Sequence, residues 1–173
     1  NRIMGIHDEA GPLELGGKGY ALACAQRAGL PVPPFIAIPP AVCESGRTPA
    51  GALEFPLALR GELAASLKTL CPNGELTAVR SSALDEDGAR CSFAGQLRSF
   101  LFVTAEEVAA RIVDVWRSAD AEQVGAYRGQ HGMLQAPRAP AVLVQRMVDA
   151  SAAGVAFSAD PVSGRRAVAV VAA

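Results

Sequence analysis

The chain has 173 residues, 50% of them hydrophobic, which is enough for one domain with a sizeable core and argues against intrinsic disorder. Its 16 basic and 17 acidic residues give a formal net charge of −1, which argues against nonspecific binding to nucleic acid or to an acidic membrane. Its apolar runs are short and broken by proline or glycine, which excludes a membrane-spanning helix.

The cysteine pattern indicates reduced thiols. The four cysteines are Cys24, Cys43, Cys71 and Cys91. They form no CxxC pair, and neither histidine lies at zinc-site spacing from any of them. Since the start of the chain also lacks the apolar segment of a signal peptide, we expect a cytoplasmic protein. The chain begins without methionine and stops within the apolar run 167–173, so we expect it to be a piece of a longer protein.

Glycine and proline separate the predicted elements of the first half. In chain order these elements are an alanine-rich helix over 17–28, an edge strand within the proline-punctuated segment 30–38, a loop over 39–56 and a helix over 58–70. The last prediction follows from Leu59, Leu63, Leu67 and Leu70, which recur at helical spacing.

The second half mixes strands and helices without strict alternation, which favours the α+β class. In chain order its predicted elements are a strand over 76–80, a polar loop over 81–95, a strand over 97–103, helices over 104–117 and 121–130, and strands over 141–148 and 153–158. Thr104 and Glu107 form the capping box of the first of these helices. The last two strands are expected to pair as an antiparallel hairpin through a turn at 149–152.

The first candidate motif is Gly16-Gly17-Lys18-Gly19. Glycines let the backbone approach a phosphate closely, and a helix that begins there directs its N–H groups at an anion. The motif is not a Walker A loop, because Gly19 replaces the required serine or threonine. The alternative is an ordinary glycine turn with a solvated lysine.

The second motif is Arg80 at the end of a predicted buried strand, followed by Ser81 and Ser82. An arginine with two hydroxyls suits bidentate phosphate binding. The alternative is a structural arginine paired with Asp85 or Glu86. We interpret the acidic residues there as a solvated turn and expect no metal site in this chain.

Two further motifs are compatible with nucleotide binding. The segment Cys91–Gln96, with Gly95, could form a flexible loop over a nucleotide, or simply a turn before a strand. The segment 142–148 and the chain reversal after it could offer backbone groups to an adenine edge, with Met147 packed on the ring. The alternative for this segment is a core hairpin.

In their order along the chain, these segments resemble the N-terminal nucleotide-binding domain of the phosphoenolpyruvate synthase and pyruvate phosphate dikinase family. The matching stretches are LGGKGYALA…AGLPVPPF, AVRSSALDEDGARCSFAGQ and VLVQRMVDASAAGVAFSADPVSG, within residues 15–164. The resemblance implies an ATP-grasp fold, of which residues 1–173 would be the first subdomain, truncated before its second half. Rifampin phosphotransferases share this domain.

The resemblance also implies roles for single residues. Lys18 matches the phosphate-binding lysine and Arg80 the arginine of the family's VRSS motif, and both are expected to be catalytic. The remaining nucleotide-binding candidates are Gly95 of the SFAGQ loop, Ser99 where the family often has threonine, Gln145 near the adenine, and Met147 and Val148 at the adjacent hinge.

In such enzymes a histidine on a separate swivelling domain takes a phosphoryl group from the β-position of ATP and passes it to an acceptor. The resemblance therefore implies ATP and Mg²⁺ as cofactors, with the metal ligands outside this chain. The implied partners are the protein's own downstream phosphohistidine and acceptor-binding domains, and neither nucleic acid nor a membrane is expected. The fragment alone is expected to be inactive.

Three functions stay open at this stage. The first is the ATP-binding part of a phosphotransferase with pyruvate as acceptor. The second is the same domain serving another acceptor, such as an antibiotic or a specialised metabolite. The third is a non-catalytic nucleotide-binding module, against which the retention of both Lys18 and Arg80 argues.

Overall fold

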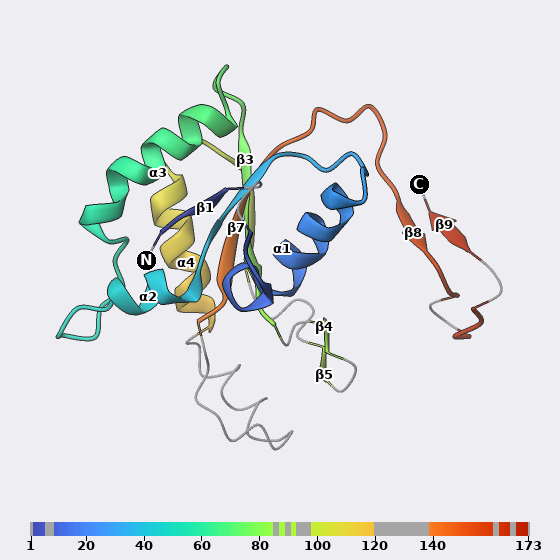
Figure 1. Cartoon of the computed structure of the whole chain (residues 1–173), viewed down its shortest axis with the longest axis horizontal. Helices are drawn as coiled ribbons and strands as arrows, with labels where there is room; N and C mark the ends of the chain where they lie inside the picture. The colour runs from blue at the N-terminus through green and yellow to red at the C-terminus, as the bar shows by residue number, and fades with distance from the viewer. Residues whose placement is uncertain are drawn as a thin grey trace.

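Five antiparallel strands form the central sheet of the chain, in the order β1-β2-β7-β3-β6 (Figure 1). The computed structural model describes residues 2–5, 9–84, 87–88, 91–92, 98–119, 139–160, 163–166 and 169–172. Within these residues the helices are α1 (Pro12–Arg27), α2 (Pro40–Ser45), α3 (Leu57–Leu70) and α4 (Val108–Ala119). The strands are β1 (Met4–Gly5), β2 (Phe35–Ile38), β3 (Thr77–Ser82), β4 (Asp87–Gly88), β5 (Cys91–Ser92), β6 (Ser99–Val103), β7 (Ala141–Arg146), β8 (Val155–Phe157) and β9 (Val170–Ala172).

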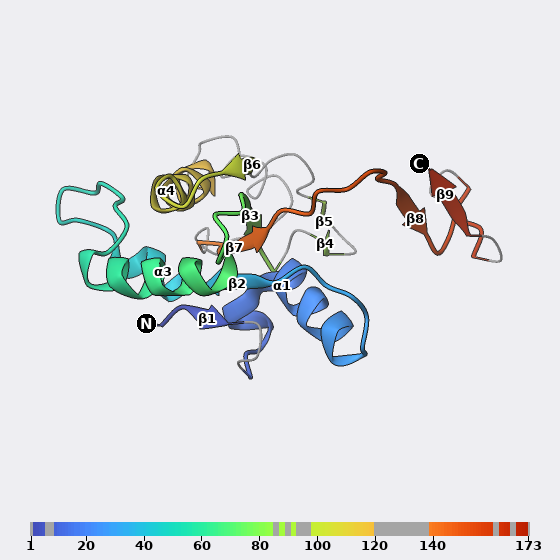
Figure 2. The ribbon, with the colours of Figure 1, turned by 90° about the horizontal axis from the view of Figure 1, so that it is seen from above.

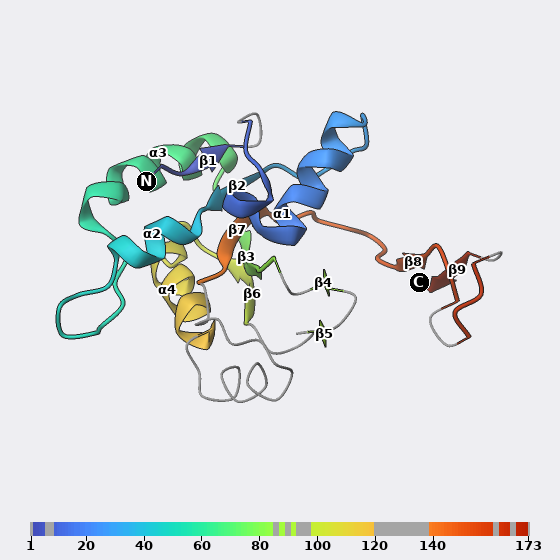
Figure 3. The same ribbon diagram turned by 60° about the horizontal axis from the view of Figure 1, so that its bottom comes forward.

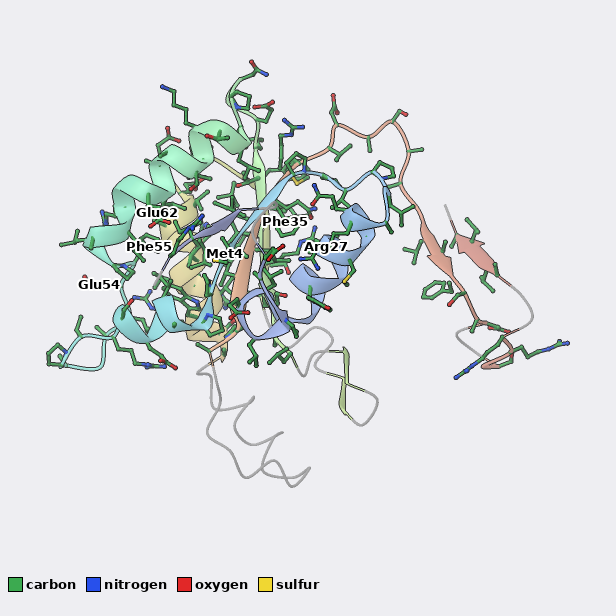
Figure 4. All side chains as sticks on the ribbon, viewed as in Figure 1. Met4, Arg27, Phe35, Glu54, Phe55 and Glu62 are labelled. Carbon is green, nitrogen blue, oxygen red and sulfur yellow. The ribbon has the colours of Figure 1, made fainter. Side chains whose placement is uncertain are left out.

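Helices cover both faces of this sheet, with α1 on one side and α4 on the other (Figure 2). The larger apolar cluster joins α2, α3 and α4 to one face of the sheet. The smaller cluster joins α1 to the other face. Figure 4 labels one residue of each cluster. Phe55 of the larger cluster lies beside α3 and α4, and Phe35 of the smaller cluster lies between the sheet and α1.

The strand β7 lies at the centre because its sequence suits burial on both faces. Val142 and Val144 belong to the larger cluster, and Leu143 between them belongs to the smaller one. Side chains alternate between faces along a strand, so an unbroken apolar run is what a doubly covered strand needs. All three of these residues are fully buried. They fix the register of β7 against β2 and β3, since a one-residue slip would exchange the two faces.

Much of the predicted secondary structure is confirmed. The helices α3 and α4 and the strands β3, β6 and β7 lie where the sequence predicts them, and the antiparallel sheet with helices confirms the mixed α and β character. The capping contact at the start of α4 is also present, because the Thr104 N–H and hydroxyl both donate to the Glu107 carboxylate. The helix expected over 121–130 lies outside the described residues.

Four expectations about pairing and loops are wrong. The segment 81–95 is not all loop, since it contains the end of β3 and the strands β4 and β5. The strand within 30–38 is not an edge strand, because β2 lies between β1 and β7. The segment 39–56 is not all loop, since it contains α2. The segment 153–158 does not pair with β7, because β2 and β3 occupy both edges of β7; instead β8 pairs with β9.

The pair β8 and β9 lies away from the central sheet, at the end of an extended segment after β7 (Figure 3). Most of its apolar side chains are exposed, with Val155 at 55% and Val171 at 72%. None of the helices that the structure describes is long and apolar enough to cross a membrane.

Candidate functional site

The helix α1 is built from two segments that meet at Gly16, whose φ of 68° and ψ of 178° are not helical. The second segment therefore begins at Gly17, as the sequence predicts. The Ser82 hydroxyl, from the end of β3, bridges the kink: it accepts a hydrogen bond from the Gly19 N–H at 2.9 Å and donates one to the Leu15 carbonyl at 2.7 Å. Gly19 and Leu15 are the i and i−4 pair that a continuous helix joins directly.

The close approach of α1 to β3 requires a glycine at position 16 and disfavours a side chain at position 17. A Cβ at Gly16 would lie 1.6 Å from the Ser82 carbonyl oxygen, and its positive φ also disfavours any other residue. A Cβ at Gly17 would lie 3.2 Å from the Ala83 carbonyl oxygen, and the Gly17 N–H donates to that same oxygen. The motif therefore packs the start of the second helical segment onto the end of β3.

Arg80 lies on the face of the sheet that α1 covers. Its cross-strand partner on β7 is Leu143, which belongs to the apolar cluster under α1. A Cβ at Gly19 would lie 2.9 Å from Leu143 Cδ2, so Gly19 stands directly over that partner. Lys18, the preceding residue, and Arg80 are thus carried to the same face from positions 62 residues apart in sequence.

The sequence predicts that the backbone N–H groups of the glycine motif face an anion, and the structure differs from this prediction. The N–H groups of Gly17 and Gly19 donate to Ala83 and Ser82, so neither is directed at a ligand. The Ser82 hydroxyl is likewise taken by α1. Ser81 alternates to the opposite face of β3, where its cross-strand partner is Val142. Side chains, rather than the glycine backbone, are left as the groups that could hold an anion here.

Ser99 and Gln145 share the face of Arg80. Ser99, on the edge strand β6, is the cross-strand partner of Arg80. Gln145 is two residues along β7 from Leu143, is 7% exposed, and its Nε2 donates to the Pro33 carbonyl at 3.1 Å. The Gln145 amide therefore also fixes the segment that leads into β2.

The hinge candidates lie at the far end of β7. The Met147 N–H donates to the Leu76 carbonyl at 2.9 Å, which ties the end of β7 to the start of β3 and occupies that donor. Val148 is 58% exposed at the beginning of the extended segment. Gly95 lies outside the described residues, as do Asp85 and Glu86, the alternative partners of Arg80.

An ion pair supports the same end of β7. Arg146 Nη1 lies 3.6 Å from Glu75 Oε1. The pKa of Glu75 is held below its ordinary value, first by hydrogen bonds from its own backbone N–H and from that of Asn73, and least by the Arg146 charge. Burial raises the pKa of the Cys71 thiol, and the nearby Glu75 charge raises it further.

The site electrostatics rest on the two cations. In the described part of the chain, no acidic side chain forms an ion pair with Arg80. The same residues hold no cluster of three or more histidine, cysteine or acidic side chains that could ligate a metal. Among the described residues, Cys24, Cys43 and Cys71 are not joined by a disulfide.

Sequence reasoning missed the role of Ser82 as the link between β3 and α1, and that of Pro33 as the acceptor for Gln145. The sequence did contain a signal for the role of Ser82. Strand alternation places Ser82 on the same face as Arg80 and Ser81 on the other, so only one of the two hydroxyls can meet α1.

Comparison with known proteins agrees with the sequence resemblance. The family model described as pyruvate phosphate dikinase, AMP/ATP-binding domain, matches residues 47–173. The matched range contains Arg80 and Gln145 and begins after Lys18.

Relatives with assigned names include "Prodigiosin synthesizing transferase PigC" of Serratia marcescens, which is 38% identical over 88% of this chain and 19% of its own length. A "Rifampicin phosphotransferase" of Streptomyces sviceus is 40% identical over 66% of this chain and 14% of its own length. A "Probable phosphoenolpyruvate synthase" of Archaeoglobus fulgidus is 41% identical over 51% of this chain and 12% of its own length. The chain thus spans less than a fifth of each of these relatives.

Proposed function

Because the chain belongs to the pyruvate phosphate dikinase AMP/ATP-binding domain family, we propose that the face of its sheet that α1 covers binds the phosphates of ATP. A phosphoryl group of this ATP is then transferred to a histidine elsewhere in the same protein. The observation that carries this proposal is the placement of Lys18 and Arg80 on one face of the sheet, through Gly19 over Leu143. Two cations on one face suit a polyphosphate, which Arg80 can meet with its planar fork and Lys18 as a point charge.

The remaining candidates extend the site from the phosphates toward the base. Ser99 stands across from Arg80 and would donate its hydroxyl to a phosphate oxygen. Gln145 and the segment from Met147 to Val148 would lie along the adenine, with Gly95 in a loop over the phosphates. Since the Met147 N–H is already bonded to Leu76, the adenine contacts would come from side chains and from backbone groups beyond it.

The mechanism proposed for the whole protein is transfer of the β-phosphoryl group of ATP to a histidine on a swivelling domain. AMP is the leaving group, and the γ-phosphoryl group passes either to water, which gives phosphate, or to inorganic phosphate, which gives pyrophosphate. Phosphoryl transfer needs mainly positioning and charge stabilisation, which Lys18 and Arg80 would supply. The Mg²⁺ that accompanies ATP would have its ligands outside this chain. We propose the described sheet as part of the first subdomain of an ATP-grasp fold, in a cytoplasmic protein.

The test of this mechanism is phosphohistidine labelling of the complete protein with ATP carrying ³²P at the β- or at the γ-position. Label from the β-position alone is the expected result, and label from the γ-position alone would contradict it. Substitution of either Arg80 or Lys18 should slow labelling by roughly 10²- to 10³-fold. ATP binding with no labelling from either position would favour a non-catalytic nucleotide-binding module.

Pyruvate is the first candidate acceptor, by analogy with the phosphoenolpyruvate synthases among the relatives. A specialised metabolite is the second candidate, favoured by the 38% identity to the prodigiosin-synthesizing transferase over 88% of this chain. The corresponding match to a "Probable phosphoenolpyruvate synthase" of Methanothermobacter thermautotrophicus is 29% identical over 86% of the chain. Phosphoenolpyruvate formation on addition of ATP and pyruvate separates the two.

A further inference from the structure

The Ser82 hydroxyl occupies a position that few side chains could fill. It is fully buried, and it lies between two backbone groups of α1, the Gly19 N–H and the Leu15 carbonyl. Only a group that donates and accepts at once can satisfy both, and a hydroxyl is the smallest side-chain group that does so. The hydroxyl thus fixes the kinked first turn of the second segment of α1, which is the turn that carries Lys18.

The same strand also carries Arg80, two residues earlier and on the same face. The strand β3 therefore sets the positions of both cations. Arg80 is part of β3 itself, and Lys18 lies in the turn of α1 that the Ser82 hydroxyl holds. Ser82 itself is 0% exposed and its hydroxyl is engaged by α1, so it is not placed to bind a ligand.

We propose that Ser82 is a positioning residue, which holds Lys18 at the separation from Arg80 that an ATP polyphosphate requires. This inference rests on the proposed function, because it assumes that both cations meet the phosphates. Loss of the hydroxyl would leave a buried donor and a buried acceptor in α1 without their partner. The first turn would then rearrange or admit water, and Lys18 would lose its fixed relation to Arg80.

The experiment measures the affinities of the complete protein for ATP and for adenosine in Ser82→Ala, in Lys18→Met and in the double variant. Ser81→Ala is the matched control, because it removes the neighbouring hydroxyl from the opposite face of β3. We expect Ser82→Ala to weaken ATP binding roughly tenfold, the loss of about one hydrogen bond to a charged group, and to leave adenosine binding within about twofold. In the Lys18→Met background, Ser82→Ala should add almost nothing.

Gly19→Ala is a second variant that perturbs the same link if Ser82→Ala does not fold. Its Cβ would lie 2.9 Å from Leu143 Cδ2, the end of a flexible side chain, and 3.1 Å from Leu15 Cβ, so we expect the first turn to shift by a few tenths of an ångström without loss of the fold. It should also weaken ATP binding more than adenosine binding.

Equal weakening of ATP and adenosine, or an undiminished effect of Ser82→Ala in the Lys18→Met background, would overturn the positioning role and leave Ser82 purely structural. Unchanged ATP affinity in Lys18→Met alone is a different outcome. It would contradict the phosphate-binding role of Lys18 in the proposed function, and this inference would fail with it.

Discussion

Gly16 and Ser82 are in backbone contact across 66 positions of sequence: a Cβ on Gly16 would lie 1.6 Å from the Ser82 carbonyl oxygen. Real Cβ atoms do not approach oxygen so closely, and here the obstructing atom belongs to the backbone of a buried strand. The position of α1 on the sheet therefore depends on the absence of a side chain at residue 16.

Gly16→Ala is expected to prevent folding or to cost more than roughly 3 kcal/mol, because it combines a positive φ with a clash against fixed backbone. Gly29→Ala is the matched control: Gly29 has a φ of 79°, but nothing lies within 4 Å of its Cβ position. It should cost only about 1–2 kcal/mol, the strain of the backbone conformation. Urea unfolding followed by Trp116 fluorescence measures both, and equal losses would contradict the steric account.

Gln145→Glu should destabilise the chain by about 1–3 kcal/mol at neutral pH, because a carboxylate cannot donate to the Pro33 carbonyl and is buried there. The loss should shrink as the pH falls and the carboxyl group regains a proton to donate. Gln145→Met, which removes the donor without adding charge, should lose less and show no such pH dependence. Urea unfolding at several pH values measures these differences. Identical profiles for the two variants would contradict the additional cost of a buried carboxylate, and a Gln145→Met variant as stable as the native chain would show that the Pro33 contact contributes nothing.

The local structure around this site follows from the sequence pattern, whereas the contacts between its elements do not. Strand alternation predicts which side chains share a face with Arg80 along β3 and with Gln145 along β7, and the glycines predict a helix start at residue 17. The pairing partners of β7 could not be predicted, because an apolar run of this kind fits any open strand edge. The bridge from Ser82 to α1 depends on how a helix docks on a sheet, which no local pattern specifies.

Stability near the start of α4 should depend on pH through Glu107. Hydrogen bonds from the Thr104 N–H and hydroxyl, with a smaller contribution from Arg111, hold the pKa of Glu107 below its ordinary value. A carboxyl group with a lowered pKa in the folded state stabilises the fold at pH values above its ordinary pKa of about 4.3. This contribution is lost as the pH falls through the pKa of the folded state.

The comparison is between the native chain and Glu107→Gln, measured by thermal unfolding from pH 7 to pH 3. The native chain should be more stable at neutral pH, and the difference should close as Glu107 becomes protonated. Curves that stay parallel over this range would contradict a stabilising role of the ionised carboxylate.

The phosphate-binding role of Arg80 is tested most directly by the affinity of the complete protein for ATP in Arg80→Gln and Arg80→Lys. Arg60→Gln is the control, because it removes the same charge from an exposed position on α3, on the other side of the sheet. We expect Arg80→Gln to weaken ATP binding roughly tenfold or more, and Arg60→Gln to change it little. Arg80→Lys should not restore binding, because lysine lacks the bidentate fork. An ATP affinity in Arg80→Gln equal to that of the native protein would contradict phosphate binding by Arg80.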